Sequence, residues 1–118
     1  MTTIKQEPSC PVHIYIAGNY DDAARACREY CCRGACVRLS RADYIYTGGQ
    51  ESGLVVSFIN YPRFPASEAE IMEQARALAA MLLDALYQKS CTIEGPTQTI
   101  WISNRLDDQS SLNPATKD

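Results

Sequence analysis

Apolar residues recur along this chain with two different periods, and these periods predict its strands and helices. Apolar and more polar side chains alternate over residues 12–17, 36–41 and 97–103, which is typical of strands with one buried face. Residues 54–59 form an apolar run after a glycine-rich turn, and we predict a further strand there. The pattern leaves open whether residues 36–41 continue unbroken into the aromatic segment before this turn.

Two other segments repeat apolar residues at intervals near 3.6, which predicts two helices. The first begins after an N-cap at Asn19 or Asp21. The second begins after an N-cap at Ser67 and runs to about Lys89. Ser67 and Glu70, three residues apart, match the capping-box pattern. Its apolar face covers more than half of the helix. That width fits a helix buried deep in the monomer or one that also packs against a partner chain.

The resulting order is β-α-β-β-α-β, which predicts an α+β fold: a four-stranded antiparallel sheet with two helices in the ferredoxin-like arrangement. Residues 91–96 are interpreted as the turn before the last strand. We assign residues 12–103 to this single domain, residues 1–11 to an N-terminal arm and residues 104–118 to a polar C-terminal tail, mobile beyond about Asp108.

Helices on one side leave the other face of the sheet open to a partner or a ligand. The alternation places six side chains on that open face: His13, Tyr15, Arg38, Ser40, Thr99 and Trp101.

Composition narrows the class of protein. The chain has 118 residues, 46% of them hydrophobic, and a net charge of −3. That charge argues against binding to duplex nucleic acid, which usually needs a basic surplus. No apolar run reaches the roughly 20 residues that cross a bilayer, and the N-terminus lacks a signal-peptide pattern. We therefore expect a cytoplasmic protein with no membrane partner.

Six cysteines are present, and four of them lie between residues 27 and 36 with the spacing C-x3-C-C-x3-C. Zinc sites usually combine C-x2-C pairs with a second pair or with histidines, and His13 is the one histidine of the sequence. We predict no metal site and no cofactor. The cysteines are expected to stay reduced and to pack as small apolar residues.

Sequence patterns for catalysis are mostly missing. The chain has no glycine motif for phosphates or dinucleotides and no nucleophile elbow. A nucleophile system would depend on His13 alone. The paired carboxylates Asp21 and Asp22 suit a helix start, and Asp107 and Asp108 fall in the predicted tail. We therefore predict no catalytic residues and a protein that is not an enzyme.

Arginine and tyrosine are the strongest candidate binding groups. Eight of the eleven basic residues are arginine, and five of these lie within residues 25–41. A planar guanidinium suits phosphate and an aromatic ring stacks on a base, although the same arginines also fit a solvated face with acidic partners. Residues 60–65 fit either a rigid connection between two prolines or a binding loop. The predicted ligand contacts are Arg25, Arg28, Tyr46, Gly48, Asn60, Tyr61, Arg63 and Arg105.

The block DYIYTGGQESG, followed by INYPRFP, a long helix and a TIWIS strand, resembles small proteins encoded by phages and prophages. Within that group the chain resembles the Thoeris anti-defence proteins that act as sponges. This resemblance implies a phage protein of the host cytoplasm that binds and sequesters a cyclic nucleotide immune signal without cleaving it. The signal would be a cyclic ADP-ribose isomer or a cyclic oligonucleotide.

The resemblance also implies a homo-oligomer, a dimer or larger, with ligands between protomers. Two alternatives remain open from the sequence. One is a ferredoxin-like inhibitor or regulatory module that binds another protein through the open sheet face. The other is a nucleotide-cleaving enzyme, which would need His13 or a bound metal at its centre.

Overall fold

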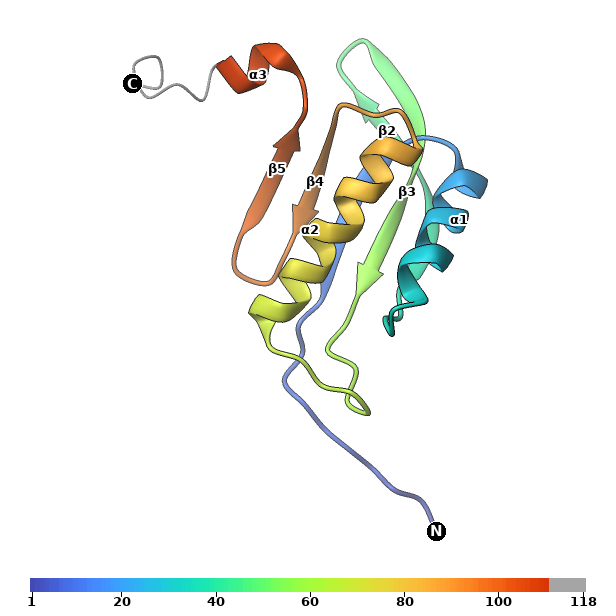
Figure 1. The fold of residues 1–118 in the computed structure, drawn as a ribbon, viewed down its shortest axis with the longest axis vertical. Helices are drawn as coiled ribbons and strands as arrows, with labels where there is room; N and C mark the ends of the chain where they lie inside the picture. The colour runs from blue at the N-terminus through green and yellow to red at the C-terminus, as the bar shows by residue number, and fades with distance from the viewer. Residues whose placement is uncertain (111–118) are drawn as a thin grey trace.

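A five-stranded antiparallel sheet carries two long helices on one face, with both strand hairpins at its edges (Figure 1). This computed structural model describes residues 1–110, so residues 111–118 of the expected tail lie outside the described part. The elements are β1 (Val12–Ala17), α1 (Tyr20–Cys31), β2 (Arg38–Tyr46), β3 (Gly49–Phe58), α2 (Glu68–Ala85), β4 (Ser90–Glu94), β5 (Thr99–Ser103) and α3 (Leu106–Ser110).

The strands lie in the order β2-β3-β1-β4-β5. The first four positions reproduce the predicted ferredoxin-like arrangement, and the antiparallel α+β class is confirmed. The prediction of four strands is wrong, because residues 91–94, interpreted as part of a turn, belong to β4. Within β4, Cys91 and Ile93 are buried and alternate with less buried neighbours, so two apolar residues suffice for a short strand. The expected last strand is therefore β5, at the edge of the sheet.

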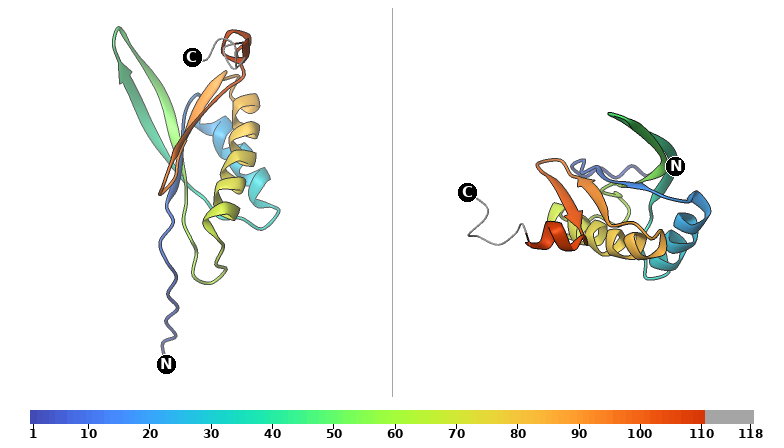
Figure 2. Two further views of the ribbon diagram at one scale, coloured as in Figure 1. Left: turned by 90° about the vertical axis from the view of Figure 1, so that its left-hand side faces the viewer. Right: turned by 90° about the horizontal axis from the view of Figure 1, so that it is seen from above.

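The strand β2 is continuous from Arg38 to Tyr46, which answers the question that the pattern left open. Its pairing with β3 extends to Tyr46 and Gly49, and Gly48 adopts a φ of 84° in the turn between them. By contrast, β1 ends opposite Gly53. The outer part of the β2–β3 hairpin therefore projects beyond the rest of the sheet as a two-stranded ribbon (Figure 2).

The core lies between the sheet and the two long helices. The strand β1 shows the predicted alternation, with Val12, Ile14 and Ile16 at most 2% exposed. From the other side, α2 contributes Leu78 and Leu82, which are fully buried. Each such side chain contributes about 1.5–3 kcal/mol through burial. This one apolar layer supports the fold and leaves the opposite face of the sheet free for other side chains.

Local capping fixes where both helices begin. The side chain of Asn19 accepts a hydrogen bond from the backbone N–H of Asp22 at 3.0 Å, so Asn19 is the N-cap of α1. In α2 the predicted capping box is confirmed. The hydroxyl of Ser67 accepts from the N–H of Glu70, while the Glu70 carboxylate accepts from the N–H of Ser67.

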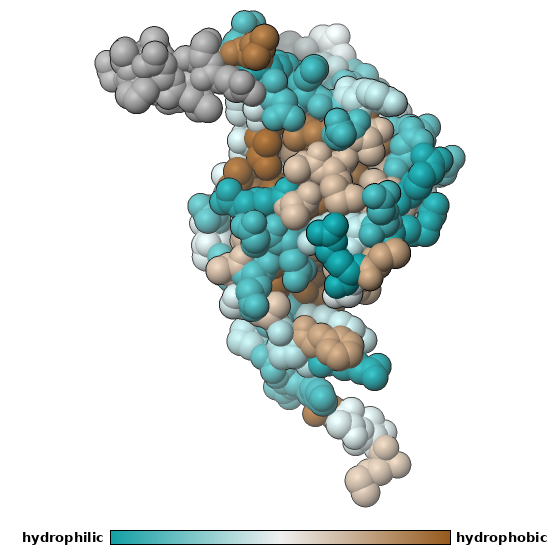
Figure 3. Space-filling model, in the orientation of Figure 1, coloured by the Kyte–Doolittle hydropathy of each residue, from teal (hydrophilic) through white to brown (hydrophobic). Residues whose placement is uncertain are grey.

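The wide apolar face of α2 is used mainly within the monomer. Met72 and Leu83, which widened the predicted stripe, are buried, and Met81 is half-buried. Figure 3 views the helix side and shows apolar atoms gathered over α2 and beside it toward β5, where Ile100 and Ile102 are partly buried. Within residues 1–110, no helix is both long and apolar enough to span a bilayer.

Candidate active site

The open face of the sheet carries two parallel rows of side chains. In the first row, the strand registers pair Arg38 with Ser57, Ser57 with His13, His13 with Glu94, and Glu94 with Thr99. Directly opposed residues in an antiparallel sheet lie about 5 Å apart, so these five side chains form a continuous strip across all five strands. We call this strip the charged row.

The second row runs beside the first and is displaced from it by two residues on each strand. It consists of Ser40, Val55, Tyr15, Thr92 and Trp101, which are again paired by register. Its main aromatic members are Tyr15 and Trp101, and Trp101 is 56% exposed. We call this strip the aromatic row. The two rows confirm the open-face prediction for His13, Tyr15, Arg38, Ser40, Thr99 and Trp101.

A short hydrogen bond connects the two rows. The hydroxyl of Tyr15 donates to Oε1 of Glu94 at 2.5 Å. This bond, with burial and the nearby negative charge of Glu94, raises the pKa of Tyr15 to about 12. The phenol therefore keeps its proton at neutral pH and holds the carboxylate in place. Glu94 lay in the segment interpreted as a turn, so sequence reasoning did not find it.

Beside the aromatic row lies a hollow of about 240 Å³, which we call the open-face hollow. Its lining includes Tyr15, Tyr44, Glu51, Trp101 and Arg105. Carboxylate and aromatic groups thus face the same space. Glu51 was also missed by sequence reasoning, because it was interpreted as part of the hairpin turn. The register of β3 assigns it to the open face, opposite Tyr44.

The position of Tyr44 depends on a missing side chain at Gly53. A Cβ at Gly53 would lie 2.7 Å from the Tyr44 ring and 2.4 Å from the backbone oxygen of Ile16. The ring therefore passes close over the glycine, and its hydroxyl donates to the carbonyl oxygen of Leu54 at 2.5 Å. Burial raises the pKa of Tyr44, so it too remains a neutral phenol.

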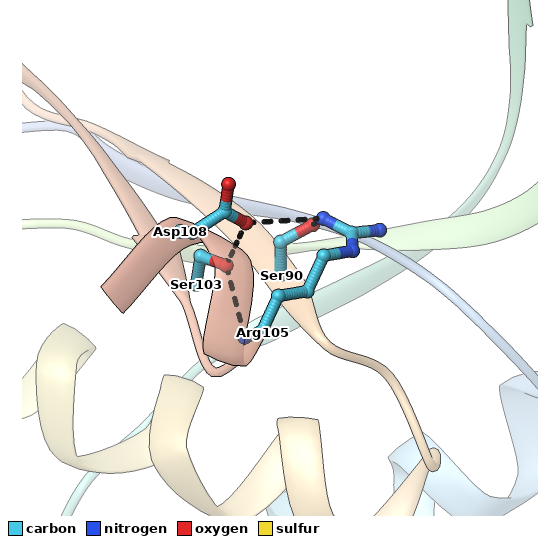
Figure 4. Close-up of polar contacts among 4 residues, drawn as sticks. All are labelled: Ser90, Ser103, Arg105 and Asp108. Carbon is cyan, nitrogen blue, oxygen red and sulfur yellow. Dashed lines mark hydrogen bonds and ion pairs between the residues drawn. The ribbon is translucent and has the colours of Figure 1, made fainter. Parts of the chain in front are cut away.

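Arg105 reaches the same hollow but is held by its own neighbours (Figure 4). Its Nη1 donates to the hydroxyl of Ser90 at 3.2 Å and lies 3.8 Å from a carboxylate oxygen of Asp108. Ser103 completes the cluster by donating to Asp108 and accepting from the backbone N–H of Arg105. Asp108 thus offsets part of the charge of Arg105, while the Arg105 side chain still lines the hollow.

Larger hollows lie elsewhere but are lined by fewer aromatic rings. One of about 480 Å³ lies at the start of α1, where the Arg41 guanidinium covers the ring of Tyr20 at 4.0 Å. That contact engages the guanidinium and covers one face of the Tyr20 ring. Another, of about 600 Å³, lies near the end of α2 and is lined partly by Ala80, Met81 and Leu83. Each of these two hollows is lined by one carboxylate and one aromatic ring, whereas the open-face hollow is lined by three aromatic rings and Glu51, so we place the candidate site on the open face.

The eight predicted ligand contacts do not converge. Arg25 and Arg28 lie on α1, on the helix side of the sheet, and Arg25 pairs with Asp22 at 3.2 Å. Tyr46 and Gly48 lie at the tip of the β2–β3 hairpin. Of the eight, Arg105 is the one that lines the open-face hollow together with Tyr15 and Trp101.

The remaining three lie beyond the opposite end of β3 from the hairpin turn. Tyr61 and Arg63 belong to the exposed loop after β3. Asn60 binds the chain itself: its Nδ2 donates to the carbonyl of Pro8 at 2.8 Å, and its Oδ1 accepts from the N–H of Ala66 at 2.9 Å. This favours the structural interpretation of residues 60–65. A role of these residues in binding stays a prediction.

The cysteines lie away from the open face or are buried. Burial raises the pKa of both Cys27 and Cys91 to about 11, which disfavours their reactive thiolate forms. In residues 1–110, all six cysteines are free thiols. Across the same residues, no group of three or more His, Cys, Asp or Glu side chains has a metal-binding arrangement.

Comparison with known proteins now identifies the type of fold. The chain has the fold of a small phage enzyme. The similar structures are those of a phage SAM lyase in its apo state and in complex with S-methyl-5'-thioadenosine. The apo structure superposes with a TM-score of 0.64 and covers 86% of this chain and 96% of that chain. The complex gives a TM-score of 0.57, with 87% and 95% covered.

Sequence identity to both structures is 14%, so the likeness establishes the fold alone. No family model and no curated protein sequence matches the chain. The resemblance to phage proteins is supported at the level of fold, but nothing here supports the Thoeris sponge family specifically. The prediction that the protein is not an enzyme is contradicted, because both similar structures are those of a lyase. That prediction rested on the absence of local motifs for phosphate, dinucleotide and nucleophile sites, and a fold shared with an enzyme requires none of these motifs.

Proposed function

We propose that this protein is an enzyme that binds S-adenosylmethionine (SAM) on the open face of its sheet. It would cleave the bond between the sulfonium sulfur and the aminobutyryl chain and release S-methyl-5'-thioadenosine. Two observations support the proposal: the shared fold with a phage SAM lyase, and the groups that line the open-face hollow.

The lining of the hollow carries the proposal. SAM combines a positively charged sulfur with a flat adenine ring. Glu51 lines the hollow and Glu94 is hydrogen-bonded to Tyr15 at its edge, so two carboxylates are near a bound cation. Trp101 and Tyr15 supply ring faces, and a cation over such a face gains about 0.5–1 kcal/mol at an exposed site. The same rings suit stacking with adenine.

The proposed reaction needs little from catalytic side chains. The carboxylate oxygen of the substrate attacks its own γ-carbon, so a C–O bond forms as the C–S bond breaks. The electron pair of the C–S bond stays on sulfur, which becomes a neutral thioether, and the amino-acid part leaves as a lactone. No proton is transferred in this step. Catalysis then depends on holding the substrate in a folded, reactive conformation, and no side chain has to act as nucleophile or general base.

The size of the hollow points to a partner copy. Small-molecule sites usually enclose about 300–1,000 Å³. The open-face hollow, at about 240 Å³, is smaller and lies on an exposed sheet. We propose that a second copy of the chain covers this face and completes the site in a homo-oligomer. In the cytoplasm of an infected host, removal of SAM would be the route by which such a protein acts against defence.

The experiment is to incubate the purified protein with SAM and to follow both products by mass spectrometry. We expect S-methyl-5'-thioadenosine and the lactone, or homoserine formed by its hydrolysis, in equal amounts. Glu94→Gln is expected to lower turnover at least about tenfold through loss of the charge near sulfur. Glu73→Gln is the matched control, because Glu73 is an exposed glutamate of α2 on the other face of the sheet.

Failure to form S-methyl-5'-thioadenosine above the rate without protein would reject the proposal. Binding of a cyclic ADP-ribose isomer or cyclic oligonucleotide, which the first resemblance implies, is tested in the same assay by adding each compound. Depletion of the cyclic compound while SAM stays intact would point to that ligand class instead.

A further inference from the structure

We infer that the charged row binds the amino-acid end of the substrate and that His13 determines specificity for it. This inference rests on the proposed function, since it assigns the two ends of the same ligand to two rows. The aromatic row would bind the nucleoside end. The charged row would bind the α-ammonium and α-carboxylate groups, which S-methyl-5'-thioadenosine lacks.

The first argument is the fixed orientation of His13. Its Nδ1 lies 2.8 Å from the hydroxyl oxygen of Ser57, the residue directly opposite on β3. Ser57 is only 6% exposed and is the one polar side chain buried in the described part of the chain. This bond engages Nδ1 whichever partner donates, and it holds the ring. The other ring nitrogen, Nε2, is therefore the atom available to a ligand.

The second argument is the charge on either side of the imidazole. Glu94 is opposite His13 on β4, and Arg38 is opposite Ser57 on β2. A carboxylate on one side and a guanidinium beyond the other match an amino-acid head, which carries an ammonium next to a carboxylate. Glu94, which the proposed function places near the sulfonium, also lies on the side that suits the ammonium. Arg38 suits the carboxylate, as does the Nε2–H of His13 in the tautomer whose Nδ1 accepts from Ser57. Tyr15 is the other titratable group that faces this part of the row.

The third argument is the distance between the rows. His13 and Tyr15 are two residues apart on β1, and two residues of a strand span about 6.6 Å. Their ring centroids are 6.1 Å apart. A ligand whose sulfur lies near Glu94 and Tyr15 can therefore reach one row with each of its ends. The Tyr15–Glu94 hydrogen bond lies at the junction where the reacting bond would be.

The test compares two ligands that differ only in the amino-acid end. S-adenosylhomocysteine carries that end without the reactive sulfonium, and S-methyl-5'-thioadenosine does not carry it. Both are titrated by calorimetry into the unaltered protein and into the variants His13→Gln and Ser57→Ala. We expect His13→Gln to raise the dissociation constant of S-adenosylhomocysteine about tenfold or more, because a hydrogen bond to a charged group is lost. Binding of S-methyl-5'-thioadenosine should change less than about twofold.

Ser57 acts through His13, so its variants separate a positioning role from a structural one. Ser57→Ala should weaken S-adenosylhomocysteine selectively but by less than His13→Gln, and Ser57→Thr, which keeps a hydroxyl, should restore part of the loss. Equal weakening of both ligands in His13→Gln, or no change for either, would overturn this inference while leaving the proposed function intact. If the unaltered protein binds neither ligand, the proposed function fails and the inference fails with it.

Discussion

Tyr15 and Glu94 join the central strand β1 to β4 through one phenol–carboxylate hydrogen bond of 2.5 Å on the open face of the sheet. The two residues are 79 positions apart in the sequence. Their contact exists because β4 lies beside β1, with Thr92 opposite Tyr15 and Glu94 opposite His13. The ferredoxin-like topology thus brings an acid from near the end of the domain to an aromatic residue near its start.

This hydrogen bond predicts that Tyr15 loses its phenolic proton at a higher pH than an ordinary tyrosine, because its pKa is raised. The pKa of Tyr15 is raised from 10.0 to about 12, first by the hydrogen bond to Glu94. Between these values the unfolded chain has lost the proton that the folded chain retains, so the stability from this group is present below pH 10 and falls as pH rises toward 12. Absorbance titration near alkaline pH should show one phenol fewer in this range for Tyr15→Phe. Glu94→Gln should shift the Tyr15 phenol to lower pH, and an unchanged titration in Glu94→Gln would contradict this assignment.

Gly53→Ala should destabilise the fold and disturb the candidate site. The added Cβ would meet both the Ile16 carbonyl oxygen and the Tyr44 ring at under 3 Å. Displacement of backbone and ring should cost about 1–3 kcal/mol in the free energy of unfolding, measured by denaturant titration. Gly34→Ala is a control without a steric clash, because a Cβ there meets nothing within 4 Å, although its φ of 99° adds backbone strain. Equal stability of Gly53→Ala and the unaltered protein would disprove the close packing of Tyr44 on Gly53.

Asn60→Ala should release the N-terminal arm. The Asn60 side chain holds the carbonyl of Pro8 and the N–H of Ala66, so its removal breaks two hydrogen bonds at once. We expect a loss of about 1–3 kcal/mol in unfolding free energy and faster proteolysis before Val12. Asn19→Ala is the matched control, because it removes the N-cap of α1 at about 1 kcal/mol but leaves the arm attached. Proteolysis of the arm at the same rate in both variants would argue against this role for Asn60.

Four of the six cysteines should react as two distinct pairs. Cys32 and Cys36 are exposed, whereas Cys27 and Cys91 are buried with pKa values raised to about 11. Because the thiolate is the reactive form, iodoacetamide at pH 8 should modify the exposed pair first and the buried pair only in denaturant. Peptide mass spectrometry measures the order. Modification of Cys91 at the rate of Cys32 in the native protein would show that the site is more open than the structure indicates.

The sequence predicted the architecture well where the alternation was strong. In β1, every second residue is apolar and buried, and the register then put His13 and Tyr15 on the open face as expected. The strand β4 was missed because Cys91 and Ile93 are its only apolar residues and Gly95 follows directly. Because Glu94 was interpreted as part of a turn, it was assigned no pairing partner on a neighbouring strand and no place on the open face.

The candidate site was harder to predict than the fold. The arginines of the sequence suit phosphate, but Arg25 pairs with Asp22 on the helix side and Arg105 contacts Ser90 and Asp108. What forms the open-face hollow is the register between strands, which no local pattern specifies. The signal in the sequence is the alternation of buried Cys91 and Ile93 with Thr92 and Glu94, which predicts a short strand over residues 90–94.

Successive side chains of a strand point to opposite faces of the sheet. The core residues of this domain therefore lie on the helix side, and the residues of the candidate site lie on the open face. Substitutions on the open face can therefore change what this surface binds without disturbing the packing of the core. The same fold occurs in a chain with 14% identity. The separation of the two faces also makes the scaffold a practical host for grafting new recognition surfaces, residue by residue, onto the uncovered side.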